Sequence, residues 1–278
     1  MSEQSRISFE FFPPRTAAQK DALNKALTEL EALSPEYFSV TFGAGGSTLD
    51  ATRETVLDLD RRSGIPVAPH ISCMAQSEAM LRGLLERYRE NGIGRLVVLR
   101  GDRPDGLDGP GPFQYANELV AFIRKEFGGA FHIEVACYPE FHPESDSPDS
   151  EMKFFKQKVD AGADGAVTQY FYNPDAYFRF LDDCERAGID IPVTPGIMPI
   201  TNYRQLARFS HMCGAEIPQW IRRRLEGFGD DMGALQAFGL DVVTRLCERL
   251  LEGGAPGLHI YTLNRAKASR ELWERLRG

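Results

Sequence analysis

Eight short runs of strand-forming residues recur along the chain, and most end in a polar or charged residue followed by glycine, proline or asparagine. The runs cover residues 7–12, 37–42, 67–73, 95–102, 132–139, 165–171, 193–198 and 257–264. Helical periodicity between them requires a parallel sheet with helical crossovers. An open doubly wound sheet would show the same alternation, but the count of eight favours closure into a (β/α)8 TIM barrel, with the active site at the carboxyl-terminal rim.

The intervening sequence predicts helices, several of which stop just before a glycine. They are expected at residues 17–33, 50–63, 77–91, 115–127, 151–161, 175–187, 202–212, 234–252 and 265–276. The longest insertion, residues 213–233, lies between the seventh and eighth strands. No Ser/Gly/Pro linker divides the 278 residues, and one barrel of about 250 residues would use nearly all of them, so residues 1–278 are expected to form one domain.

Bulk properties exclude several functional classes. A net charge of -8 argues against binding to a nucleic-acid backbone, because such domains usually carry a basic surplus. The start is polar and no run of about 18 apolar residues occurs, so neither a signal peptide nor a membrane span is predicted. The five cysteines are widely spaced, with no C-x-x-C pair, which indicates reduced thiols in a cytoplasmic protein.

Glu10 is the strongest candidate for acid–base chemistry. Side chains alternate along a strand, so Glu10 points opposite to Phe9 and Phe11 and into the expected barrel mouth. Burial of a carboxylate would raise its pKa and suit it to general acid catalysis near neutral pH. The alternative is a structural carboxylate that is bonded to a neighbouring strand.

Polar groups at two other strand ends could bind a ligand. Arg100 offers a planar fork for an anion or a carbonyl, and Asp102 can accept bonds from a heterocyclic N–H, unless the two form a mutual ion pair. Gln169 can donate and accept together, which suits a pterin-like or flavin-like edge. Its alternative is a core amide that is bonded to backbone.

Other mechanisms find less support. His70 and His142 are equally well explained as structural histidines, and no metal site is predicted because H-x-H at a strand end and H-E-x-x-H are both absent from the sequence. No predicted strand contains a lysine, which argues against Schiff-base chemistry. The glycine-rich loop at residues 43–48 lacks the third glycine of a dinucleotide-binding fingerprint, since Thr48 stands there.

Ordered short motifs carry a resemblance to a known family. They are FEFFPP at residues 9–14, VTFGAGG at 40–46, APH at 68–70, LRGD at 99–102, YPEFHPE at 138–144, KVDAGA at 158–163, TQ at 168–169 and YTLNR at 261–265. Each is weak alone, but in this order they resemble the catalytic domain of the 5,10-methylenetetrahydrofolate reductase family over essentially the whole chain.

The resemblance implies a flavin-dependent oxidoreductase. NADH or NADPH would reduce a tightly but non-covalently bound FAD and leave, and methylenetetrahydrofolate would take its place and be reduced to 5-methyltetrahydrofolate. By position, Glu10 and Asp102 would be catalytic: Glu10 as the general acid that opens the folate imidazolidine ring, Asp102 as the carboxylate that bonds the pterin and tunes the flavin. Gln169 and Arg265 would bind folate with them.

The resemblance also implies a set of FAD contacts, namely Thr41, His70, Arg100, Gly101, Asp102, Tyr115, Ala116, Tyr138, His142 and Lys158. The chain departs from the family pattern at Glu151, Phe154 and Leu225, the last standing where some relatives have phenylalanine. Homo-oligomers among relatives imply self-association. The competing interpretations are another flavin-dependent barrel oxidoreductase, proline-dehydrogenase-like, and a non-catalytic folate-binding barrel.

Overall fold

The computed structural model describes residues 6–42, 49–73, 77–101 and 111–278. Within them, nine strands form one sheet whose pairs are all parallel, in the order β7-β6-β5-β4-β3-β2-β1-β9-β8. The strands are β1 Arg6–Phe11, β2 Tyr37–Val40, β3 Val67–Ser72, β4 Arg95–Leu99, β5 His132–Cys137, β6 Gly165–Thr168, β7 Val193–Thr194, β8 Gly196–Ile197 and β9 Gly257–Tyr261.

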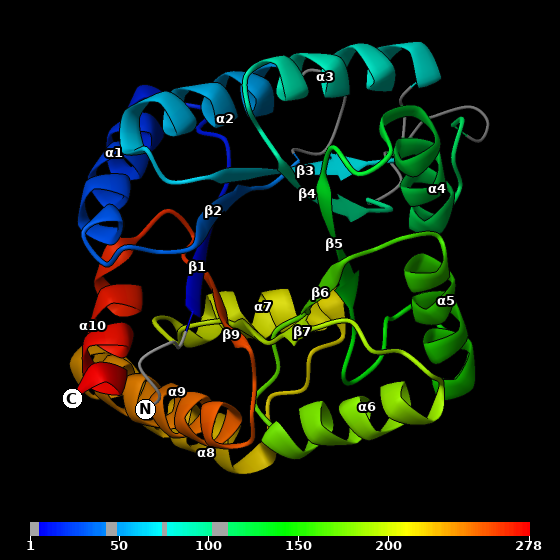
Figure 1. Ribbon diagram of the computed structural model, residues 1–278. Coiled ribbons are helices and arrows are strands. Elements are labelled where there is room, and N and C mark those ends of the chain that lie inside the picture. The colour runs from blue at the N-terminus through cyan, green and yellow to red at the C-terminus, as the bar shows by residue number, and fades with distance from the viewer. Residues whose placement is uncertain (1–5, 43–48, 74–76, 102–110) are drawn as a thin grey trace.

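Helices surround this sheet as an outer ring (Figure 1). They are α1 Ala17–Glu31, α2 Leu49–Ser63, α3 Glu78–Glu90, α4 Ala116–Phe127, α5 Pro148–Asp160, α6 Pro174–Arg186, α7 Tyr203–Cys213, α8 Gln219–Gly227, α9 Met232–Glu252 and α10 Ala266–Arg277. Strand and helix alternate as predicted, and the barrel class is confirmed.

The predicted seventh strand, residues 193–198, is divided in the structure into the two short strands β7 and β8. Pro195 has no N–H to donate to a ladder, so it separates β7 from β8. β7 pairs with β6 and β8 pairs with β9, so the two halves reach opposite ends of the strand order. The barrel therefore closes through residues 193–197, and the ninth strand in the count comes from this break.

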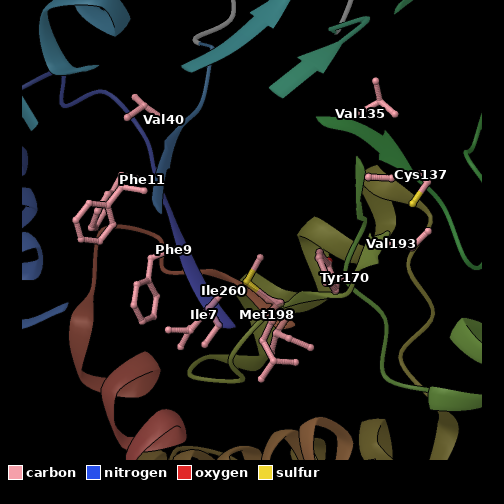
Figure 2. Packing of buried hydrophobic residues seen from close by; sticks show 14 of the residues in the cluster. Ile7, Phe9, Phe11, Val40, Val135, Cys137, Tyr170, Val193, Met198 and Ile260 are labelled. Carbon is pink, nitrogen blue, oxygen red and sulfur yellow. The ribbon is translucent and has the colours of Figure 1, made fainter. Parts of the chain in front are cut away.

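β1 shows how alternation divides core from barrel interior. Phe9 and Phe11 are fully buried and lie on the side of the strand that faces the outer helices (Figure 2). Ser8 and Glu10 take the opposite side, as the period-two rule requires. Ser8 is buried inside the barrel, and Glu10, two residues further along the strand, lines the cavity at the carboxyl-terminal end.

Two differences from the predicted helices have a clear physical reason. α5 begins at Pro148 instead of residue 151, because the Ser147 hydroxyl caps the helix and proline fits its first turn. α8 lies inside the insertion at residues 213–233, for which no helix was predicted, and it buries Ile221 and Leu225. Leu225 is therefore a core residue in this fold.

Candidate active site

A cavity of about 690 Å³ lies at the carboxyl-terminal ends of the strands. Its volume is in the range of small-molecule and cofactor sites, roughly 300–1,000 Å³. The structure brings most of the sequence-predicted site residues into its lining: Glu10, Thr41, His70, Arg100, Gly101, Tyr115, Ala116, Tyr138, His142, Lys158 and Gln169. Residues far apart in sequence meet here because every strand ends at the same rim.

Two predicted site residues are not in that lining. Asp102 lies outside the described residues, as does the loop at residues 43–48. Arg265 is exposed and precedes the first residue of α10, whereas Leu263, two residues earlier, does line the cavity.

Glu10 lies between two histidines. One carboxylate oxygen is 3.3 Å from His70 Nε2 and 3.8 Å from His259 Nε2. Burial lowers the pKa of His70, so its imidazole is neutral near pH 7. His70 Nε2 is buried and makes no hydrogen bond within the described residues, which leaves it available to the Glu10 carboxyl group or to a ligand.

Asn264 fixes the chain just after Glu10. Its Oδ1 accepts the Phe12 N–H at 3.0 Å and its Nδ2 donates to the Phe12 carbonyl at 2.9 Å. Asn264 adopts φ = 56°, a left-handed conformation that asparagine tolerates better than most residues. The exits of β1 and β9 are thereby joined, and the cavity wall beside Glu10 is held in place.

The opposite side of the cavity carries cations. Arg100 donates two bonds to the Glu144 carboxylate, at 2.7 and 2.8 Å, so its fork already holds an anionic group. Lys158 Nζ donates to the Ala136 carbonyl at 2.6 Å, and burial lowers the pKa of this lysine. A buried ammonium beside a cavity favours an anionic ligand there.

Aromatic side chains flank the cations. The Tyr138 and His142 rings meet edge-on with centroids 4.8 Å apart, and His142 Nδ1 accepts the Glu144 N–H at 3.1 Å. Tyr115 and Phe154 stack with centroids 6.0 Å apart, although they are 46% and 41% exposed. An exposed stacked pair at a cavity offers a face for a planar heterocycle.

Sequence reasoning did not identify as site residues the polar side chains of β9 or those inside the barrel below the cavity. His259 and Tyr261 line the cavity, while Leu258 and Ile260, which alternate with them in the sequence, are buried in the apolar core. This alternation was visible at residues 257–261 and could have identified both. Among the described residues, no His, Cys, Asp or Glu group is arranged to hold a metal ion, and none of the described helices is long and apolar enough to span a membrane.

Comparison with known proteins gives consistent results. A family model described as methylenetetrahydrofolate reductase matches residues 1–277. The 5,10-methylenetetrahydrofolate reductase of Escherichia coli (strain K12) is 38% identical over 266 residues, which are 96% of this chain and 88% of that protein. Methylenetetrahydrofolate reductase (NADH) 1 of Arabidopsis thaliana is also 38% identical, over 96% of this chain and 47% of that protein.

One solved structure shares the fold at low sequence identity. It is an uncharacterized protein from Clostridium thermocellum that binds two copies of 5-methyl-5,6,7,8-tetrahydrofolic acid. Its TM-score is 0.69 at 16% identity, and the match covers 99% of this chain and 96% of that chain. At this identity the likeness supports the fold alone.

Proposed function

The chain belongs to the methylenetetrahydrofolate reductase family, and we propose that it reduces 5,10-methylenetetrahydrofolate to 5-methyltetrahydrofolate with electrons from NADH or NADPH that pass through a bound FAD. The observation that carries this proposal is the convergence of the motif residues on one cavity, with Glu10 on one side and Arg100 and Lys158 on the other. Family membership disfavours the proline-dehydrogenase-like and non-catalytic interpretations.

The described residues fit a flavin dinucleotide. Lys158 can contribute positive charge to a diphosphate, and Arg100 can do so by exchanging the Glu144 carboxylate for phosphate oxygens. The Tyr115–Phe154 pair can take a planar ring such as adenine. Gly101 has φ = +80°, and a Cβ atom there would meet Ser72 Oγ at 2.1 Å, so only glycine lets the backbone follow this path beside the cavity. Thr41, His70, Ala116, Tyr138 and His142 complete the proposed contacts.

When bound, the flavin would take a hydride from the nicotinamide and deliver it to the one-carbon unit of folate. The protein would supply proton transfer and orientation. Glu10, in its protonated form, would donate a proton to the ring nitrogen that leaves as the imidazolidine opens. Gln169 would hold the pterin edge with its amide, and Asp102 and Arg265 are proposed for the same substrate by their place in the family motifs.

The donor, the assembly and the location are further parts of this proposal. The plant relative carries NADH in its name, which favours NADH over NADPH here. Self-association and a cytoplasmic location are inferred from the family resemblance and from the cysteine usage. Sedimentation of the purified protein tests the first, and fractionation of cells tests the second.

The function is tested in two steps. The protein should purify yellow with flavin absorption bands, and anaerobic stopped-flow mixing should show NADH bleaching the flavin and methylenetetrahydrofolate restoring its colour. Repeating the first step with NADPH gives the donor preference. A colourless protein that cannot be reconstituted with FAD, or a reduced flavin that methylenetetrahydrofolate leaves bleached, contradicts the proposal.

A further inference from the structure

The guanidinium of Arg100 is paired with a carboxylate from the loop after β5. Its two terminal amino groups donate to the two carboxylate oxygens of Glu144, at 2.7 and 2.8 Å, and both residues line the cavity. The bond with Arg100 lowers the pKa of Glu144, so this carboxyl group is ionised at neutral pH. A phosphate group binds arginine through the same pair of donors, because carboxylate and phosphate share one bidentate geometry with the guanidinium.

Two acidic side chains, Glu144 and Glu151, line the cavity together with Arg100 and Lys158, and they differ in their freedom to move. Glu151 is buried on α5 and accepts the hydroxyl proton of Ser145. The side chain of Glu144 is 63% exposed, whereas that of Arg100 is 29% exposed. Glu144 can therefore turn into solvent, where water replaces the guanidinium. An exposed ion pair contributes little net stability, so this exchange costs little.

The backbone around Glu144 is held independently of the ion pair. The Glu144 N–H donates to His142 Nδ1 at 3.1 Å, and the Ser145 N–H donates to the His142 carbonyl at 2.9 Å. Earlier in the same loop, Glu140 accepts the Glu216 N–H at 2.7 Å. Separation of Glu144 from Arg100 should therefore move one side chain and leave the loop in place.

The cations of this wall are fixed from behind. The Arg100 carbonyl accepts from Ser72 Oγ at 2.8 Å and from Cys73 Sγ at 3.1 Å, so the start of its side chain is anchored. Lys158 Nζ donates to the Ala136 carbonyl at 2.6 Å. A diphosphate would thus meet two anchored cations, and the Glu144 side chain is the group that has to give way.

We propose that Glu144 is an intramolecular competitor for Arg100, which occupies the pair of donors that the diphosphate of FAD takes and must turn away for that cofactor to bind. The proposal rests on the function proposed above, in which FAD fills this cavity. If Glu144 instead stayed in place to orient Arg100, its carboxylate would lie beside the phosphates, where like charges repel. The competition makes the site selective, because a ligand needs both negative charge and further contacts to displace Glu144.

The test measures FAD binding to the full-length protein after removal of flavin, by the quenching of flavin fluorescence. Glu144→Gln keeps the size of the side chain and removes its charge, so the Kd for FAD should fall about fivefold, the upper end for an exposed ion pair. Inorganic pyrophosphate should compete with FAD, and its inhibition constant should fall by a similar factor. Glu126→Gln is the matched control, because Glu126 accepts from Arg82 at 2.9 Å on α4, outside the cavity lining, and should change neither constant.

An Arg100→Gln background separates competition from the general effect of one lost negative charge. Arg100→Gln alone should weaken FAD binding, and the addition of Glu144→Gln should then leave the Kd unchanged. An equal gain in both backgrounds overturns the competition. Weaker FAD binding by Glu144→Gln alone also overturns it, since Glu144 would then orient Arg100. A wild type that binds no FAD contradicts the proposed function, whereas one whose Kd for FAD is unaffected by Glu144→Gln contradicts only the role of Glu144.

Discussion

The Glu10 carboxyl group lies beside the imidazoles of His70 and His259, and in the proposed function it also donates a proton to the substrate. Replacing it therefore tests that proton transfer. Glu10→Gln keeps the shape of the side chain and removes the acidic proton. Reduction of methylenetetrahydrofolate should therefore fall by about 10²–10⁴-fold, the usual contribution of a general acid, while flavin reduction by NADH stays as in the wild type. Anaerobic stopped-flow measurement of each half-reaction separates the two effects.

Glu271→Gln, on the outer helix α10, is the matched control and should change neither half-reaction. If Glu10→Gln still reduces folate at the wild-type rate, the acid role assigned to Glu10 is wrong. Loss of both half-reactions together would point instead to damage of the cavity or of flavin binding.

The sequence predicted the position of a side chain correctly where the pattern of a single strand was enough to place it. Alternation alone places Glu10 opposite to Phe9, and the strand ends place Arg100 and Gln169 at the rim. Partners across the barrel were out of reach, because Tyr37 and Glu134 are 97 positions apart and meet only through the register of the closed sheet. The Glu144 partner of Arg100 was missed for the same reason.

Among the elements, the packing of β8 against the ends of β6 and β9 depends on Gly196. A Cβ atom there would lie 2.2 Å from the Thr168 carbonyl oxygen and 2.6 Å from the Tyr261 hydroxyl, which bond to each other. Gly196→Ala must push β6 and β9 apart, so we expect the free energy of unfolding to fall by about 1–3 kcal/mol, the usual cost of overpacking. Urea unfolding followed by far-UV circular dichroism measures it.

Gly83→Ala is the control for that substitution. Gly83 lies inside α3, and a Cβ atom there meets nothing within 4 Å. Alanine in an open helical position should stabilise the protein by roughly 0.5–1 kcal/mol. If Gly196→Ala raises the free energy of unfolding as Gly83→Ala does, the close contacts at Gly196 do not require glycine.

The elements themselves were predictable to the extent that their signals were local. The glycines after the helices gave boundaries within a few residues, and the structure shows Ser77 and Asn202 capping α3 and α7. The missing N–H of Pro195 explains the break between β7 and β8. The sequence alone did not show it, because the break is defined by the different partner strands of the two halves, β6 and β9. α8 was hidden in an insertion, because only tertiary packing of Ile221 and Leu225 makes its short apolar stripe meaningful.

At the scale of the whole molecule, closure of the sheet turns scattered strand ends into one cavity. Glu10 from β1 and Tyr261 from β9 are neighbours in the strand order, although they are separated by most of the sequence. The same closure turns Ser8 and His259 into the barrel, whereas apolar side chains such as Phe9, Val40 and Ile260 lie on the other side of their strands (Figure 2). Fold and site are therefore consequences of one alternation pattern.

The stability of the whole molecule should depend on pH through Glu140, which joins the segment after β5 to the insertion by accepting the Glu216 N–H at 2.7 Å. Burial raises the pKa of Glu140 to about 7. The folded state then binds the proton more tightly than the unfolded state, so this stability is fully present below the ordinary carboxyl pKa and is lost as pH rises through about 7.

Glu140→Gln keeps an acceptor for Glu216 and removes the charge, so its free energy of unfolding relative to wild type should rise between pH 5 and pH 8. The gain should be about 1–2 kcal/mol, discounted from about 1.4 kcal/mol per pKa unit because the side chain is partly exposed. Urea unfolding at both pH values measures this, with Glu274→Gln on α10 as an exposed control. A gain of equal size at pH 5 would show that the substitution acts through packing, not through the buried charge.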